Sequence, residues 1–572
     1  MKNYFIIYLL IFSLNVFAQQ ESTIKTYQLP LIEIVSKKQI PFVNKYEYST
    51  DYNSTIFYKN GYSLIRRGMN FTQDLYVEGY KRGNVKIVID GEHYHNACPN
   101  RMDAPATRLN MIELSEIELT KSAALIGTGL YGKIEYHRSK LEDNLRLKSI
   151  ITGNYGAQKD YYASFSVGAL FTNLSVRYSS GVPYENGESK SFKDLYGYQD
   201  NNRFYFTNVS IRKAINNYGL EFGGSFTHAK DISFPYLQMD ERKSKVFNGF
   251  IAYKGNKLYF NFTDHLMNNE LRTNFSTMQM ETDAKNLTIG LTGDFYEFIY
   301  RNWNANNYIN MPMMGMFISN KLMPNVDHIG LNLYKEFVFD QFKTYVKGGV
   351  HLLRYKDDSR SNFYKELFHD TKQNRLFFSL GLLGSYSKHI NKNLIFMTTA
   401  ELATEAPEAE QLFIAVNRSM SNPDWSGNPT LKNPVRVSLR TTVILNPLSI
   451  ELFGNYNIKY IEVVKKMKSM KPTMTYDNVN AIIAGTNVTL SYKWIESVLS
   501  YTWGENIKSK SPLAEIAPLS LITTIKTPDI MGFKFIFSHR YENAQTRINE
   551  DLKEFKTAAW NTISLGVQYI VI

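Results

Sequence analysis

The residues best suited to chemistry in this sequence are a cysteine and a methionine in one short loop. Cys98 is the only cysteine of 572 residues, and Met102 follows it four positions later. A thiolate and a thioether are soft donors, a pair that favours Cu(I) over harder divalent ions. Pro99 and Pro105 predict an irregular, stiff loop around them. The structural alternative is that a lone cysteine is more often a small buried hydrophobe and that methionine mostly fills cores.

A second pair of candidate ligands lies much later in the chain, at His265 and Met267. Segment 257–267 alternates in polarity, so that His265 and Met267 fall on one face of a strand while Leu258 and Phe260 fall on the other. Imidazole and thioether both suit copper, so the pair could supply half of a metal site. On its own, such a histidine at the end of a strand is more often a solvated residue.

Further histidines and methionines gather near these segments or in predicted loops. His93 and His95 flank the Cys98 loop at strand spacing, where they could join the site, feed it or serve as polar loop residues. We interpret the methionines of predicted outer loops as a sulfur-rich funnel for a soft ion; they are Met278, Met280, Met311, Met313, Met314 and Met316. No Gly-x-Ser-x-Gly or His-Glu-x-x-His motif occurs, so the sequence predicts a protein that is not an enzyme.

The first residues of the chain indicate export. Lys2 supplies a positive start, residues 5–12 are apolar, and Val16-Phe17-Ala18 forms a small-residue cleavage site, which predicts a signal peptide at 1–18. No later run of about 20 apolar residues follows, so we expect no transmembrane helix. An exported chain with one cysteine cannot form an internal disulfide, so Cys98 is either free or a ligand.

The net charge of +12 suggests an anionic partner. Lys and Arg are scattered and no aromatic-basic pattern of RNA binding is present, so for an exported chain we exclude nucleic acid. A mildly basic surface suits lipid headgroups and the lipopolysaccharide of an outer membrane.

From about residue 141 the sequence alternates between apolar and polar residues over several hundred positions. Clear examples are Asn208–Arg212, Leu287–Thr292, Ile329–Tyr334 and Ile563–Tyr569. Together with 40 Tyr and 36 Phe, this period of two is typical of an outer-membrane β-barrel. At roughly 20 residues per strand and connection, we expect an all-β transmembrane barrel of about 22 antiparallel strands, a size that requires a plug.

The connections and the preceding domain fit that architecture. Tight turns at Asn216–Asn217 and Gly255–Asn256 alternate with long polar connections predicted at 227–243 and 268–285. The predicted domains are the signal peptide at 1–18, an N-terminal extension at 19–45, an α/β plug domain inside the lumen at 46–140 and the barrel at 141–572. A soluble all-β secreted protein would not explain a small α/β domain before so many uniform hairpins.

In these features the chain resembles the TonB-dependent outer-membrane receptors over essentially its whole mature length. Leu75–Tyr80 followed by Val88–Gly91 resembles the family's "RG…LIDG" plug region. Ile112–Lys121 followed by Leu130–Gly132 is similar to its "IERIEVLKGP…LYG" region, and Gly427–Lys432 looks like its barrel motif "GNPxLKPE".

The sequence departs from the family pattern at a few plug positions. Glu78 stands where an arginine is usual, Ser122-Ala123 replaces Gly-Pro, and Lys133 interrupts a Gly-Gly pair. The β-prone run Leu31–Ser36 lies where the resemblance places either the TonB box or the start of the plug.

Within that family, Cys98-x-x-x-Met102 and His265-x-Met267 resemble the copper-receptor branch, whose metal is held by a CxxxM of the plug and an HxM of the barrel. The resemblance implies that these four residues capture copper, expected as Cu(I), in the outer membrane. It also implies that TonB, the energy-coupling partner, pulls the N-terminal segment of the plug and opens a path to the periplasm.

Two other functions remain open on the sequence alone. One is a TonB-dependent importer of a metal chelate or siderophore, in which Cys98 is merely structural. The other is a copper-binding surface barrel that transports nothing; contact between an intact TonB box and TonB would separate it from an importer.

Overall fold

The computed structural model describes residues 43–47, 61–66, 68, 73–155, 159–357, 359, 361–369, 372–418 and 422–569. Residues 41–572 form one compact unit. The predicted signal peptide and the Leu31–Ser36 segment lie outside the described residues. None of the helices within the described part is long and apolar enough to cross a membrane.

Most of the described chain forms a closed barrel to which 22 strands belong, 20 of them in the antiparallel wall. In chain order, these strands are β8 (Arg146–Asn154), β9 (Lys159–Ala169), β10 (Thr172–Val182), β11 (Phe204–Ile215), β12 (Leu220–Ile232), β13 (Asp240–Tyr253), β14 (Asn256–Asn268), β15 (Gln279–Thr292), β16 (Tyr296–Met311), β17 (Met316–Phe339), β18 (Phe342–Tyr355), β19 (Asn374–Asn391), β20 (Leu394–Thr404), β21 (Ala415–Val416), β22 (Asp424–Ser426), β23 (Val435–Leu445), β24 (Leu448–Lys468), β25 (Lys471–Tyr492), β26 (Ile495–Asn506), β27 (Ser520–Lys526), β28 (Phe533–Glu542) and β29 (Trp560–Tyr569).

Two of these strands do not form part of the main wall. β21 and β22 are two and three residues long and belong to the connection between β20 and β23, which pair directly with each other. The remaining strands are joined as successive antiparallel hairpins, the arrangement that leaves no open edge and satisfies every backbone group in a bilayer. The fold class predicted from the alternation of the sequence is therefore confirmed.

The strand β14 shows how the sequence produces the two faces of the wall. Leu258 and Phe260 are exposed on the outside, whereas Tyr259, Asn261 and Thr263 are buried toward the lumen. Alternate side chains of a strand point to opposite faces, so an apolar outer surface and a polar interior follow from a period of two.

The connections differ from the predicted ones in extent. β12 continues to Ile232 and β13 begins at Asp240, so the connection is 233–239 and not 227–243. In the same way β15 begins at Gln279 and leaves only 269–278. Polar side chains occupy both faces of these strand ends, which removes the alternation by which a strand is recognised.

Short helices lie in the connections and in the segment before the barrel. The α-helices are α3 (Phe192–Tyr196), α4 (Ser361–Phe368) and α5 (Ala409–Phe413). The 3-10 helices are η1 (Arg82–Asn84), η2 (Pro105–Arg108), η3 (Met111–Glu113), η4 (Asn216–Tyr218), η5 (Thr273–Ser276), η6 (Pro312–Met314) and η8 (Glu550–Leu552).

The segment before the barrel forms a five-stranded sheet in the order β1-β6-β7-β4-β5 and a separate hairpin, β2-β3. Its strands are β1 (Val43–Glu47), β2 (Tyr62–Arg66), β3 (Gln73–Val77), β4 (Val85–Ile89), β5 (Glu92–His93), β6 (Leu114–Thr120) and β7 (Gly132–Arg138). Apolar side chains of one sheet face, such as Ile87, Ile117 and Ile134, form a buried core. We call this segment the plug.

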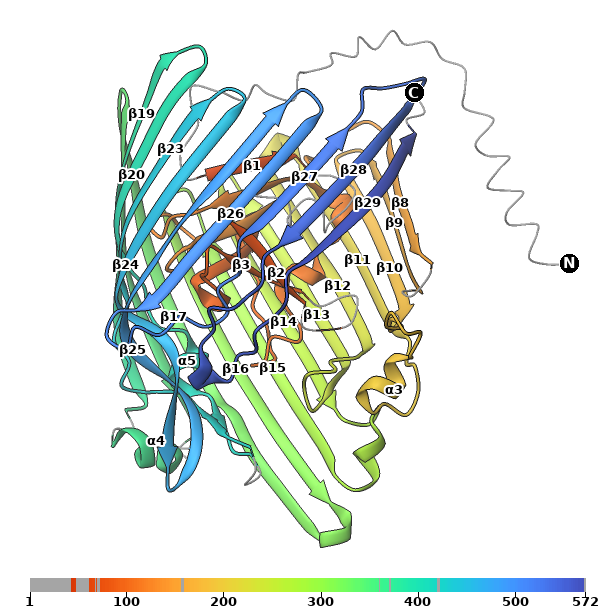
Figure 1. Ribbon diagram of the computed structural model, residues 1–572, viewed down its shortest axis with the longest axis vertical. Coiled ribbons are helices and arrows are strands. Elements are labelled where there is room, and N and C mark those ends of the chain that lie inside the picture. Colours follow the sequence, from red (N-terminus) through yellow and green to blue (C-terminus); the bar gives the residue numbers. More distant parts are fainter. Residues whose placement is uncertain are drawn as a thin grey trace, which may run out of the picture. The chain divides into compact units, whose positions relative to one another are not determined.

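The plug lies inside the ring of barrel strands (Figure 1). It contacts the wall on opposite sides: the Asn261 side chain of β14 donates to the His93 backbone carbonyl, and the Tyr80 hydroxyl donates to Asn457 of β24. A second kind of contact is a buried charge network, in which Glu78 meets Lys121 at 2.6 Å and Arg440 of β23 at 2.6 Å. Arg440 of the barrel wall thus pairs directly with Glu78 of the plug.

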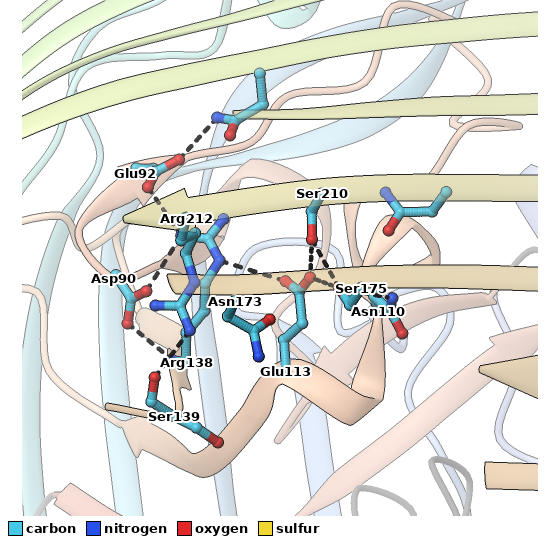
Figure 2. Close-up of polar contacts among 12 residues, drawn as sticks. Asp90, Glu92, Asn110, Glu113, Arg138, Ser139, Asn173, Ser175, Ser210 and Arg212 are labelled. Atoms are coloured by element: carbon cyan, nitrogen blue, oxygen red, sulfur yellow. Dashed lines mark hydrogen bonds and ion pairs between the residues drawn. The ribbon is translucent and has the colours of Figure 1, made fainter. Parts of the chain in front are cut away.

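A further polar network holds the plug near β10 and β11. In Figure 2, Arg138 lies between Asp90 and Glu92, and Glu113 accepts hydrogen bonds from Ser175 and Ser210. Arg138 Nη1 is 3.1 Å from the Asp90 carboxylate and 3.0 Å from the Glu92 carboxylate. The plug is therefore fixed by many separate polar contacts in addition to its own apolar core.

Candidate metal centre

The loop that carries Cys98 is shaped by hydrogen bonds to its own backbone. The Asp103 carboxylate accepts from the N–H groups of Ala97 and Cys98 at 2.7 and 3.0 Å. The Cys98 carbonyl accepts from the Arg101 N–H at 2.9 Å, and Arg101 adopts a positive φ of 56°. These bonds fold 97–103 into a tight turn with Cys98 and Met102 both buried.

The same loop is tied to the barrel and to the rest of the plug. The Trp303 indole N–H of β16 donates to the Ala97 carbonyl at 2.7 Å, and Asn286 of β15 donates to the Asn96 carbonyl at 2.7 Å. On the plug side, Arg101 forms a paired contact with Asp74, at 2.6 and 2.9 Å. The position of the thiol relative to the wall is thereby set from both domains.

The second half of the candidate site lies near the end of β14, where the strand alternation places it. His265 and Met267 both point into the lumen and are 0% and 2% exposed. The Ser244 hydroxyl of β13 contacts His265 Nδ1 at 2.8 Å, while the Glu241 carboxylate is 4.0 Å from the same nitrogen. Because Ser244 engages Nδ1, Nε2 is the ring nitrogen that would face a metal ion.

The structure brings the two halves together. Cys98 Sγ of the plug lies 3.7 Å from Met267 Sδ of the barrel. Met102 belongs to the same buried cluster as both residues, and its backbone N–H contacts the Cys98 thiol. We call Cys98, Met102, His265 and Met267 the sulfur site; their role as copper ligands stays a prediction.

The charge state of Cys98 is controlled by its surroundings. Burial raises the pKa of the Cys98 thiol above its ordinary value and the Asp103 carboxylate raises it further, against the backbone N–H groups of Met102 and Asn100, which lower it. The thiol is therefore protonated at neutral pH. A metal ion that binds here must displace this proton, since the thiolate is the ligand form.

The other predicted histidines and methionines do not form part of the sulfur site. His93 contacts Glu297 of β16, and His95 Nδ1 lies 3.1 Å from the Thr288 hydroxyl. Met313 and Met314 are 84% and 73% exposed at the tip between β16 and β17. Met280, in contrast, is buried in β15 and so does not lie on an exposed loop as predicted. The interpretation of the other methionines as a funnel remains a hypothesis.

Several residues that support the site could not be identified from the sequence. Ser244 and Trp303 are ordinary strand residues whose partners, His265 and Ala97, lie 21 and 206 positions away in the chain. Met239 is another: its Sδ accepts from the Thr282 hydroxyl at 3.7 Å, and Thr282 stands opposite Met267 in the register. The pairing of β13, β14, β15 and β16 brings these groups to the site.

The fold is that of the plugged barrels of TonB-dependent outer-membrane receptors. One similar solved structure is described as the copper transporter OprC, with 17% identity, 93% of this chain and 90% of that chain covered, and a TM-score of 0.70. Another is a mutant of the ferric enterobactin receptor PfeA from Pseudomonas aeruginosa in complex with enterobactin, at 12% identity, with 93% of this chain and 92% of that chain covered and a TM-score of 0.59. A third is the siderophore receptor PirA from Acinetobacter baumannii, at 12% identity, 92% coverage of both chains and a TM-score of 0.57. No family model matches the sequence, and a comparison with curated proteins gives no match.

Proposed function

We propose that this protein is a TonB-dependent importer of copper in the outer membrane, exported by a signal peptide at 1–18. The ion is the cargo, and the sulfur site captures it as Cu(I). The observation that carries the proposal is the 3.7 Å separation of Cys98 Sγ and Met267 Sδ, one from the plug and one from the wall. Two sulfurs that share one tetrahedral metal at about 2.3 Å each are about 3.8 Å apart.

The donor set determines which ion is favoured. Three sulfur ligands and one imidazole are soft to borderline donors, which select Cu(I) over the hard cations that carboxylates hold. The surrounding side chains, such as Ala284, Trp303 and Phe234, make the site dry, so a bound ion would lose its hydration shell and gain fixed ligands in exchange.

The division of the ligands between two domains gives a means of release. Tight capture needs all four groups, and a displacement of the plug separates Cys98 and Met102 from His265 and Met267. A ligand shifts an equilibrium only through its different affinity for two states, and an intact and a divided site provide that difference. TonB supplies the work by pulling on the N-terminal segment, for which Leu31–Ser36 is the candidate contact.

The main alternative is an importer of a metal chelate or siderophore, because two of the similar structures are siderophore receptors. In that case Cys98 and Met267 would only pack against each other. Free copper would then bind no more tightly to wild type than to a variant without the thiol. A measurement of uptake distinguishes both kinds of importer from a copper-binding barrel that transports nothing.

The experiment that tests the proposal measures radioactive copper uptake by cells and copper binding by the purified protein. Deleting Leu31–Ser36 should abolish uptake and leave binding intact, because the segment is remote in sequence from the sulfur site. Cys98→Ser should abolish both, whereas Met111→Leu, a volume-conserving change in the plug core, should alter neither. Normal uptake by the deletion variant would contradict TonB-driven import.

A further inference from the structure

A second group of potential metal ligands lies on the plug, away from the sulfur site. Glu116 and Glu118 of β6 and His137 of β7 each offer one ligand atom, and these atoms lie within 4.8 Å of one another. The register explains their proximity: Glu116 stands directly opposite His137, and Glu118 is two positions further along the same sheet face. We call these three residues the carboxylate–imidazole cluster.

The imidazole of this cluster has a nitrogen without a hydrogen bond. His137 Nε2 is buried and finds no hydrogen-bond partner among the described residues. The nearest carboxylate oxygen, Glu118 Oε2, is 3.7 Å away. That separation is too long for a hydrogen bond and shorter than the sum of one metal–nitrogen and one metal–oxygen bond, which is about 4.2 Å.

Carboxylates and a cavity surround the imidazole of the cluster. Burial alone would lower the pKa of His137, but the neighbouring carboxylates, Glu118 foremost, outweigh it and raise the pKa above its ordinary value. Asp90 adds a further carboxylate 3.9 Å from His137 Nδ1. His137 also lines a cavity of about 530 Å³ that reaches the short turns at Gly255 and Gly293, so an ion could arrive through it.

We propose that Glu116, Glu118 and His137 bind a divalent cation of borderline hardness, Zn²⁺ or Cu²⁺. One imidazole and two carboxylates are a ligand set for such ions, and they lack the sulfur that selects Cu(I). Because the three ligand atoms lie within 4.8 Å of one another, rotation of the two glutamate side chains would bring all three onto one ion. The site is independent of the copper capture proposed above, since it shares no residue with the sulfur site.

The position of the cluster suggests what an ion there would do. β1, the strand nearest the N-terminus among those described, pairs with β6 so that Glu47 and Lys45 stand opposite Glu116 and Glu118. A bound cation links β6 to β7 immediately beside this strand. It would therefore stiffen the part of the sheet through which a pull on the N-terminus is transmitted.

The test is Zn²⁺ titration of the purified full-length protein by calorimetry, in a Cys98→Ser, Met267→Ala background that silences the sulfur site. We expect about one Zn²⁺ per chain, lost in His137→Ala and in Glu118→Gln. The control is His389→Ala, an exposed histidine of β19, which should bind as the background does. Heat-modifiable gel mobility verifies that each variant is folded.

Two results would overturn the proposal. One is a background protein that binds no Zn²⁺, which would mean that the neighbouring Lys133 balances the carboxylates instead. The other is equal binding in His137→Ala and in the His389→Ala control. Neither result bears on copper capture, which is measured with Cys98 intact.

Discussion

The sulfur site and the carboxylate–imidazole cluster differ in which domains supply their side chains. Cys98 Sγ of the plug meets Met267 Sδ of the wall, so the first site exists only while the two domains are docked. Glu118 and His137 come from paired strands of one sheet, so the second site moves with the plug as a unit. A plug movement therefore divides the first and leaves the second intact.

The two sites also differ in donor chemistry. The sulfur site is buried beside apolar side chains and contains three sulfur donors, whereas the other combines two carboxylates with an imidazole beside a cavity. Soft ions should therefore prefer the sulfur site, and borderline ions the carboxylate–imidazole cluster. We therefore expect one chain to bind two kinds of metal, one site being sensitive and the other insensitive to movement of the plug, and the following changes test that contrast.

The largest effect is expected from Cys98→Ser. A serine hydroxyl does not ionise at neutral pH and is a hard donor, so copper affinity should fall by at least about 100-fold. Zn²⁺ binding at Glu116, Glu118 and His137 should not change. Metal content of the purified variant, compared with wild type and with Met111→Leu, measures both effects, and retention of wild-type copper by Cys98→Ser would exclude the thiol as a ligand.

Met102→Ala and Met267→Ala should each weaken copper binding by about 10- to 100-fold, because each removes one neutral thioether and leaves three ligands. Neither change should unfold the barrel, since its strand pairing does not depend on these side chains. Competition with a Cu(I) chelator gives the affinities, and gel mobility reports the fold. If the double variant binds copper like wild type, the set of four ligands is wrong.

Glu78→Gln should weaken the docking of the plug. Burial opposes ionisation of Glu78, but Arg440 and Lys121 hold its pKa below the ordinary value, so the carboxylate is charged and, together with Glu451, balances both cations. Removing one partner of such a buried group costs about 3–5 kcal/mol. Faster hydrogen exchange of plug amides and weaker copper binding should follow, with Zn²⁺ binding unchanged.

The matched control for that variant is Glu188→Gln. Glu188 pairs with Lys190 at 2.8 Å on the exposed connection before α3, where an ion pair contributes at most about 1 kcal/mol. A loss of Zn²⁺ binding together with copper binding in Glu78→Gln would show that the second site also depends on docking.

The smallest effect is expected from Ser244→Ala. The hydroxyl contacts His265 Nδ1 at 2.8 Å and so orients the ring without binding the ion itself. Its removal should lower copper affinity about tenfold, the lower end of the range for such supporting groups. Ser497→Ala, a serine of β26, serves as the control, and an unchanged affinity in Ser244→Ala would remove this orienting role.

Part of this structure could be predicted from the sequence, because local patterns determine it. The period of two in β14 places His265 and Met267 on the lumen side, and the prolines around Cys98 indicate a loop. The resemblance to the copper receptors then joined the two segments into one predicted site, which spacing alone could not do.

The remaining contacts depend on which strands pair and in which register. The contact of Ser244 with His265 requires the register of β13 and β14, and the contact of Glu78 with Arg440 joins residues 362 positions apart. The strand ends at Ile232 and Asp240 were missed because polar side chains on both faces there resemble a loop. The carboxylate–imidazole cluster was missed because Glu116 and His137 are ordinary residues until β6 and β7 pair.

The most direct test of the central claim is X-ray absorption spectroscopy at the copper edge of the purified, copper-loaded protein. It reports the number and type of atoms bound to the metal. We predict a shell of three sulfurs and one nitrogen, reduced by one sulfur in Met267→Ala. A shell of nitrogen and oxygen alone would contradict copper capture by Cys98, Met102, His265 and Met267.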